Sequence, residues 1–273
     1  MFKCPASYCV PARMICNNRW DCHGGSDETD CKNDTFPYFF KCKKESIYLP
    51  QVDICDGQVQ CFLSYDDEYL CQQSPCPSSC TCNGYCLLCL NVNITRFPTI
   101  SEYQRLVILQ GNSIHIVKTN NAHFYVLYRL DVKSNQIKCI EPKSFQNFLT
   151  LNELDISDNL ISIIRMNTFF GLTSQETLVL AGNPTHSISY GSFSGLSNLT
   201  QLSLQGLCIS TLGKDAFRGL HFLQLLDLSK NNLQSLVNKT FHVFKMVMLI
   251  NLTSTKIQQS RFDIFSSLDV LQE

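Results

Sequence analysis

Cysteine is the residue type whose number and spacing most directly imply chemistry in this chain. The sequence has 16 cysteines, and fourteen of them lie in the first 89 residues. Such a density is typical of disulfide scaffolds that form in an oxidising compartment, so we expect an extracellular protein. Zinc is the alternative for the closely spaced Cys82, Cys86 and Cys89. The oxidising context favours disulfides over zinc at these positions.

The residues that could support catalysis are not arranged for it. No histidine lies beside a serine or cysteine nucleophile in a recognisable motif, and the sequence has no glycine-rich phosphate loop. The six histidines are His23, His115, His123, His186, His221 and His242. A formal net charge of −1 gives no reason to expect nucleic acid as a partner. We therefore expect a binding protein and not an enzyme.

A repeat organises the carboxy-terminal two thirds of the chain. The phrase L-x-x-L-x-L-x-x-N-x-I recurs at spacings of 23 and then 24 residues. Its asparagine position falls on Asn112, Asn135, Asn159, Asn183, Leu207, Asn231 and Thr255. The positions five and three residues earlier are aliphatic in every unit. This pattern predicts a leucine-rich-repeat solenoid of about seven units, with a parallel β-sheet on its concave face and an irregular or short-helical convex face.

Two further columns of the repeat have predicted structural roles. The asparagine amide both donates and accepts, so it can bond backbone groups where each strand ends. Leu207 and Thr255 then mark two weakened positions. Ten residues after the asparagine position, units two to seven carry phenylalanine, which we expect to stack in the core: Phe145, Phe169, Phe193, Phe217, Phe241 and Phe265. Cys139 and Cys208 lie three units apart, too far to form a disulfide.

The segment before the repeats resembles the cysteine-rich amino-terminal cap of extracellular leucine-rich-repeat proteins. The resemblance rests on Cys76-Pro-Ser-Ser-Cys80-Thr-Cys82, followed by Cys89, and we expect this cap over 76–98 with the repeats over 99–273. It implies the pairs Cys76–Cys82 and Cys80–Cys89. Cys86 is an extra cysteine that could replace Cys89.

Two earlier segments resemble the low-density-lipoprotein-receptor class A module. Residues 1–31 carry five of its six cysteines and the motif Ser26-Asp27-Glu28, and residues 36–71 repeat the plan with four cysteines and Asp66-Asp67-Glu68. The first module lacks its first cysteine, and this absence leaves Cys9 without its partner. We take it as a sign that the chain begins inside a module. The second lacks one whole bridge. The pairs implied are Cys4–Cys22, Cys16–Cys31, Cys42–Cys61 and Cys55–Cys71.

The class A resemblance also implies structural calcium. A hard cation takes about six to eight oxygen ligands, which clustered carboxylates can supply. The alternative is an acidic loop that is merely solvated. The side chains at the ligand positions would be Asn17, Asp21, Asp27 and Glu28 in the first module, and Asp56, Gln60, Asp66 and Asp67 in the second. The backbone carbonyls would be those of Met14, Arg19, Asp53 and Gln58.

The order of the modules resembles the ectodomain of relaxin-receptor-type leucine-rich-repeat G-protein-coupled receptors, especially invertebrate members with several class A modules. The resemblance implies a plasma-membrane receptor region whose repeats bind a peptide or protein hormone and whose class A modules aid activation. The G protein would then be reached only through a seven-helix domain after Glu273. The alternative is a secreted or matrix adhesion protein built from the same modules. A lipoprotein receptor is disfavoured because the second class A module has lost a bridge and an acid.

In that family, acidic residues of the concave face hold basic side chains of the ligand. The positions implied here are Asp131, Glu153, Asp155 and Asp227. Arg129 and Lys133 lie beside them, so the alternatives are internal ion pairs or a face that is merely solvated.

Five sequons suit a secreted glycoprotein: Asn33, Asn93, Asn198, Asn238 and Asn251. Asn251 should project from the concave face, where a glycan would confine binding to earlier units. No apolar stretch is long enough to span a bilayer, and no secretory signal opens the sequence.

Overall fold

The computed structural model describes residues 2–3, 9–10, 39–45, 47–50, 58–69, 76–83, 86–100, 104–117, 127–141, 143–213, 215–236, 240–258, 265 and 268. The chain divides into two compact units. One comprises Met1–Cys76 with Cys82–Cys86, and the other comprises Pro77–Thr81 with Leu87–Glu273. The boundaries of the individual modules stay predictions.

The first unit contains small paired strands. β1 (Phe2–Lys3) and β2 (Cys9–Val10) pair antiparallel, as do β3 (Phe39–Lys41) and β4 (Tyr48–Pro50), and α1 spans Asp66–Tyr69. These elements are too short to bury a sizeable core, so cross-links must stabilise them.

One such cross-link lies between Cys42 and Cys61. Cys42 and Cys61 form a disulfide with a Cα–Cα distance of 5.6 Å, and both are fully buried. Beside it, the buried carboxylate of Asp67 accepts the backbone N–H groups of Gln60 and Cys61 at 2.6 and 3.1 Å. The disulfide is the pair that the class A resemblance implies. The acid therefore fixes the backbone next to the bridge.

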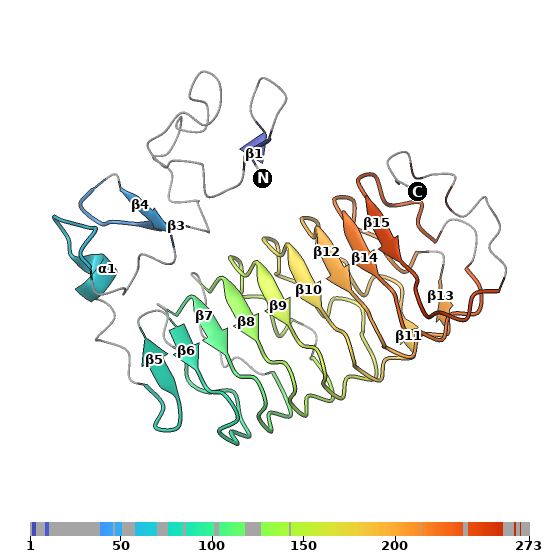
Figure 1. Ribbon diagram of the computed structural model, residues 1–273, viewed down its shortest axis with the longest axis horizontal. Helices are drawn as coiled ribbons and strands as arrows, with labels where there is room; N and C mark the ends of the chain where they lie inside the picture. The colour runs from blue at the N-terminus through green and yellow to red at the C-terminus, as the bar shows by residue number, and fades with distance from the viewer. Residues whose placement is uncertain are drawn as a thin grey trace. The chain divides into compact units, whose positions relative to one another are not determined.

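The second unit is a parallel β-solenoid (Figure 1), and the predicted fold class is confirmed. Its nine-stranded sheet has the order β15-β14-β12-β10-β9-β8-β7-β6-β5. The strands are β5 (Thr81–Asn83), β6 (Cys86–Leu88), β7 (Leu106–Ile108), β8 (Arg129–Asp131), β9 (Glu153–Asp155), β10 (Thr177–Val179), β12 (Gln201–Ser203), β14 (Leu225–Asp227) and β15 (Leu249–Asn251). From β7 to β15 the Cα partners are equivalent residues of successive repeats.

The convex side of the solenoid is made of turns. A second short parallel pair, β11 (Ser187–Ile188) with β13 (Thr211–Leu212), lies across the solenoid from the main sheet (Figure 1). In the described part of the repeats, the other convex segments are successive turns. Of the two expected forms, the convex face therefore takes the irregular one.

The core between the two sides contains the predicted phenylalanine column. Phe145, Phe169, Phe193, Phe217 and Phe241 are fully buried, and neighbouring rings stack with centroids 6.0–6.2 Å apart. Phe265 continues the column at 5.8 Å from Phe241. Each unit can bury its ring only against the next, which is why the units do not fold separately.

An asparagine ladder holds the strand ends. Asn159 donates through Nδ2 to the carbonyls of Val132, Ile156 and Ser157 at 3.0, 3.1 and 3.0 Å, and its Oδ1 accepts the N–H of Ile137 at 3.0 Å. Its partners therefore belong to its own unit and to the preceding one. Asn135 and Asn231 repeat the arrangement.

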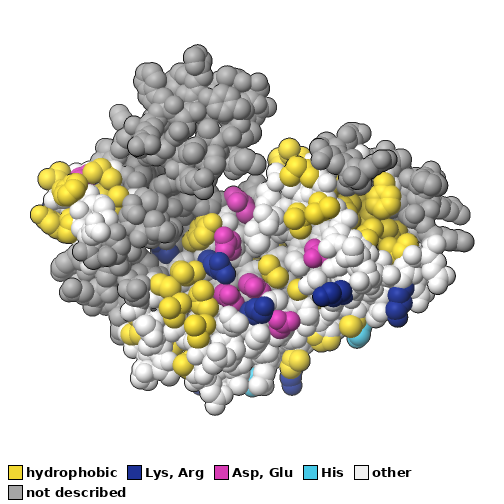
Figure 2. All heavy atoms as spheres, in the orientation of Figure 1, with side chains coloured by type: hydrophobic (Ala, Val, Ile, Leu, Met, Phe, Trp, Pro, Cys, Tyr) yellow, Lys and Arg dark blue, Asp and Glu magenta, His cyan; other side chains and the backbone are white. Residues whose placement is uncertain are grey.

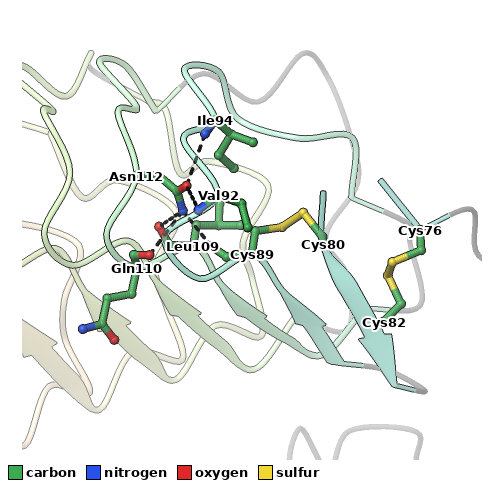
Figure 3. Close-up of a disulfide and its surroundings, with 9 residues drawn as sticks. All are labelled: Cys76, Cys80, Cys82, Cys89, Val92, Ile94, Leu109, Gln110 and Asn112. Carbon is green, nitrogen blue, oxygen red and sulfur yellow. Dashed lines mark hydrogen bonds between the residues drawn. A yellow bond between two sulfur atoms is a disulfide. The ribbon is translucent and has the colours of Figure 1, made fainter. Parts of the chain in front are cut away.

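The ladder begins at the cap (Figure 3). Asn112 donates to the carbonyl of Cys89 at 2.6 Å, and Cys89 is bonded to Cys80. A second bridge joins Cys76 to Cys82. These are the two pairings that the cap resemblance implies, and Cys86 stays a free thiol whose pKa is raised by burial. The cap thus supplies the first partner for the ladder.

At Leu207 the ladder is interrupted, and the preceding unit compensates. The N–H of Thr185, which an asparagine at 207 would accept, donates instead to the carbonyl of Asn183 at 2.9 Å. The Thr185 hydroxyl donates to the carbonyl of Ile161 at 2.7 Å. The N–H that an asparagine at 207 would accept is therefore satisfied within unit four, the hydroxyl bond reaches back to unit three, and the Leu207 side chain adds no hydrogen bond between units four and five.

Gln175 is a polar residue in an aliphatic column. It is fully buried, and its Nε2 donates to the carbonyls of Asn152 and Thr177 at 2.9 and 2.5 Å. Among the described residues its Oε1 has no hydrogen-bond partner. The equivalent residues of the other units are Leu127, Leu151, Leu199, Leu223 and Val247.

Gln175→Leu is therefore expected to raise the free energy of unfolding by about 1–3 kcal/mol, because it removes a buried acceptor that has no partner. Urea unfolding of the oxidised chain measures the change. Leu199→Gln, the reverse change one unit later, should lower stability. A loss of stability in Gln175→Leu would contradict the argument.

Candidate ligand-binding surface

A charged cluster occupies the concave face over β8 and β9. Parallel pairing sets Arg129 opposite Glu153 and Asp131 opposite Asp155. Acidic and basic side chains alternate over the middle of the face shown in Figure 2, with apolar side chains toward both ends. Three of the four predicted ligand residues are thus brought together. Asp227 lies on β14, separated from β9 by β10 and β12.

Arg129 neutralises part of this cluster. Its guanidinium lies 3.2 Å from Glu153 Oε2 and 3.7 Å from Asp131 Oδ2. Lys133 pairs with Asp158 at 3.6 Å and not with Asp131. Glu153 also accepts the Tyr128 hydroxyl at 3.4 Å. Internal pairing, one of the alternatives weighed from the sequence, therefore applies to Asp131 and Glu153.

The strand-end acids have a structural role that the sequence interpretation missed. The side chain at the third position of a strand accepts the N–H two residues later: Asp131 from Lys133 at 3.0 Å, Asp155 from Ser157 at 2.8 Å, Asp227 from Ser229 at 2.9 Å and Asn251 from Thr253 at 3.1 Å. This Asx-type turn closes the strand end. Recurrence of Asp or Asn at this position was the signal that could have revealed it.

The environment of Asp131 opposes its ionisation. Burial raises the pKa of its carboxyl above the ordinary value, and Asp155 adds to the rise, while the Lys133 N–H and the Arg129 and Lys133 charges act in the opposite direction. The Tyr128 hydroxyl is raised in pKa as well, first by burial and then by Glu153 and Glu176. Burial is therefore the main cause at both groups, and the carboxylates of Asp155, Glu153 and Glu176 add to it.

Asp155 and Asp227 are the two predicted ligand acids outside the Arg129 ion pairs. Both are half-buried, and within the described part of the chain neither forms an ion pair. Each uses Oδ1 for the Asx-type turn, so Oδ2 can accept a partner's donor. A basic group could bind here without displacing an internal cation.

The predicted calcium ligands are described only in part. Asn17, Asp21, Asp27, Glu28, Asp53 and Asp56 lie outside the described residues, as do Met14 and Arg19. Gln60 and Asp67 lie side by side, and the backbone N–H of Gln60 donates to the Asp67 carboxylate at 2.6 Å. Their oxygens are of the type that calcium prefers. Within the described residues, no group of three or more His, Cys, Asp or Glu residues is placed to hold a metal.

The predicted glycosylation asparagines and the remaining cysteines are described only in part. Asn93 and Asn198 are exposed, and Asn251 lies on β15 with its Oδ1 accepting the Thr253 hydroxyl at 2.8 Å. Asn33 and Asn238 lie outside the described residues, as do Cys4, Cys16, Cys22, Cys31, Cys55 and Cys71. Cys139 and Cys208 are free thiols.

Comparison with known proteins identifies both module types. The leucine-rich-repeat family matches residues 126–184 and 176–233, and the low-density lipoprotein receptor class A domain matches residues 1–31. CD320 antigen from Rattus norvegicus is 36% identical over 76 residues, which cover 28% of this chain and 28% of that protein. The matched region thus spans less than a third of that relative. Among the described residues, no helix has the length and apolar character to cross a bilayer.

Disulfide-linked class A and leucine-rich-repeat modules together indicate an extracellular region that binds ligands.

Proposed function

We propose that this chain is the ligand-sensing extracellular region of a G-protein-coupled receptor of the relaxin-receptor type, and that its concave repeat face binds a basic peptide or protein hormone. The observation that carries the proposal is the pair of concave acids, Asp155 and Asp227, which form no ion pair among the residues that the structure describes. Module order supports the receptor class, with the class A modules aiding activation.

The geometry suggests how a basic ligand would be held. A guanidinium or ammonium group beside β9 would meet the Oδ2 atom of Asp155, with Glu153 two residues earlier on the same strand and Asp131 opposite on β8. Arg129 already holds those two neighbours in fixed positions, so they need little reordering on binding. Preorganised charges favour fast and specific association more than raw affinity.

Removing the charge of Asp155 and Asp227 tests the binding surface. In the double variant Asp155→Asn with Asp227→Asn, the amide oxygen of each asparagine can accept the same backbone N–H as the aspartate Oδ1, so the fold should be retained. Hexa-arginine, used as the probe, should bind the double variant about ten- to a hundredfold more weakly than the parent, because charge-assisted hydrogen bonds contribute about 1.5–3 kcal/mol. Isothermal titration calorimetry at fixed ionic strength measures the change.

The matched control is Glu141→Gln, which removes an exposed acid from the convex side. It should leave hexa-arginine affinity unchanged. Equal affinity of parent and double variant would remove the concave acids from the proposal.

The receptor part of the proposal has a separate test. Sequencing the full transcript should reveal seven apolar segments of membrane-spanning length after Glu273. A reading frame without them would favour the alternative, a secreted or matrix adhesion protein of the same modules.

Structural calcium in the class A modules belongs to the same proposal. Gln60 and Asp67 would contribute oxygens in the second module, and the ion would hold the acidic segment beside the last bridge. Titration calorimetry of the oxidised chain should give a saturable heat at millimolar calcium, and no heat would refute calcium binding.

A further inference from the structure

The convex side of the solenoid has a pocket that the concave binding surface does not use. Its volume is about 440 Å³, and it crosses three successive repeats. Its lining includes Met166 of unit three, Tyr190, Ser194 and Ser197 of unit four, and Arg218 and His221 of unit five. A volume of this size lies within the range of about 300–1,000 Å³ that small-molecule sites have.

The pocket exists because of one small side chain. The residue after the core phenylalanine is Phe170 in unit three, Ser194 in unit four and Arg218 in unit five. Phe170 is 49% exposed and projects from its unit, whereas Ser194 turns back and donates to the carbonyl of Gly191 at 2.7 Å. The hollow therefore lies where the large side chain of the neighbouring units is missing.

Arg218 gives the pocket its charge. Its guanidinium carbon lies 5.4 Å from the centre of the Tyr190 ring, and its Nη1 donates to the Tyr190 hydroxyl. Within the described part of the chain Arg218 has no ion pair, and no acidic side chain lines the pocket. The guanidinium is thus held in place by an aromatic ring, and its charge is not neutralised there.

We propose that this pocket binds one acidic sugar unit, a pyranose that carries a carboxylate or sulfate group. The Arg218 guanidinium matches the fork geometry of such an anion. Met166, Tyr190 and the glycine backbone offer apolar surface to the C–H face of the ring, and the hydroxyls of Ser194 and Ser197 can bond its polar edge. Acidic sugars are present on extracellular glycans, in the compartment that the disulfides indicate.

Calorimetric titration of the full oxidised chain tests the proposal with three probes. Sialyllactose supplies a carboxylate, a heparin-derived disaccharide supplies sulfate and carboxylate, and lactose is neutral. We expect saturable binding of at least one acidic probe and none of lactose. Which acidic probe binds more tightly identifies the source of the sugar, a sialylated glycan or a sulfated polysaccharide.

Three variants locate the binding. Arg218→Gln, which keeps a donor for Tyr190 but removes the charge, should weaken the acidic probe at least tenfold. Ser194→Phe copies the residue of unit three, fills the hollow and should have the same effect. Arg165→Gln removes another exposed cation of the convex side and should have no effect.

Two results would overturn the proposal: no saturation by either acidic probe at millimolar concentration, or unchanged binding in Arg218→Gln. Equal binding of lactose would likewise refute recognition of an acid. Circular dichroism of Ser194→Phe checks its fold, and the exposed Arg218 variant keeps the test decisive if that fold is lost.

Discussion

Gly171→Ala is expected to lower the free energy of unfolding by about 3–5 kcal/mol. Gly171 has a φ of +101°, and a Cβ atom built on it would lie 2.4 Å from the Cα of Gln146 and 2.8 Å from the carbonyl oxygen of Phe145. Both contacts are backbone atoms of the preceding unit, so no side chain can move aside. The substitution therefore combines a strained φ with a displaced unit.

Gly219→Ala separates these two contributions. Gly219 has nearly the same φ, +100°, but its nearest heavy atoms would lie 3.8 Å from the new Cβ. Only the conformational strain of about 1–3 kcal/mol should remain. Urea unfolding of both variants, followed by circular dichroism, measures the difference. Equal losses at the two positions would show that the close backbone approach at Gly171 is not destabilising.

Asn159→Leu is the second substitution with a large expected effect. It removes three donated hydrogen bonds and leaves the buried N–H of Ile137 without its acceptor. The carbonyls of Val132 and Ile156 keep a second asparagine donor, from Asn135 and Asn183. We expect a loss of about 3–5 kcal/mol, mostly from the stranded N–H and the lost bonds. Denaturant unfolding gives the value.

The natural gap at Leu207 supplies the control for this prediction. There, Thr185 redirects its own N–H and adds a hydroxyl donor. Adding Ile137→Thr to Asn159→Leu copies that pair of residues two units earlier in the stack. The double variant should recover part of the lost stability. A loss below about 1 kcal/mol in Asn159→Leu alone would mean that the ladder contributes little to the fold.

The repeat fold was predictable because its signal is periodic. The seven concave strands of the repeats, β7 to β15 in the main sheet, fall at the expected aliphatic positions, as β9 does around the buried Leu154, and the phenylalanine column stacks as expected. The residue before each ladder position was not predicted. It has a φ of 52–72° in all seven units, yet only three of the seven are glycine: Gly111, Ser134, Asp158, Gly182, Gly206, Lys230 and Ser254. A mixed composition conceals a common backbone conformation.

The candidate surface was only partly predictable. Parallel pairing makes Asp131, Glu153 and Asp155 neighbours, so their clustering follows from the repeat. Which acids are neutralised depends on side-chain rotamers: Arg129 reaches across to Glu153, whereas Lys133 turns to Asp158. The convex pocket depends on a missing side chain at Ser194, and the sequence interpretation treated the convex positions only as core or turn.

The gap in the asparagine ladder has a consequence for how the solenoid holds together. In a stack of repeats, stability is the sum of each unit and its interface with the next. The junction between the units of β10 and β12 lacks the side-chain hydrogen bonds that an asparagine at position 207 would form. The convex pocket spans the same junction, because Tyr190 belongs to the unit of β10 and Arg218 to the unit of β12. A ligand seated in the pocket would clamp these two units together, so its binding free energy would add to the cooperativity of the whole stack.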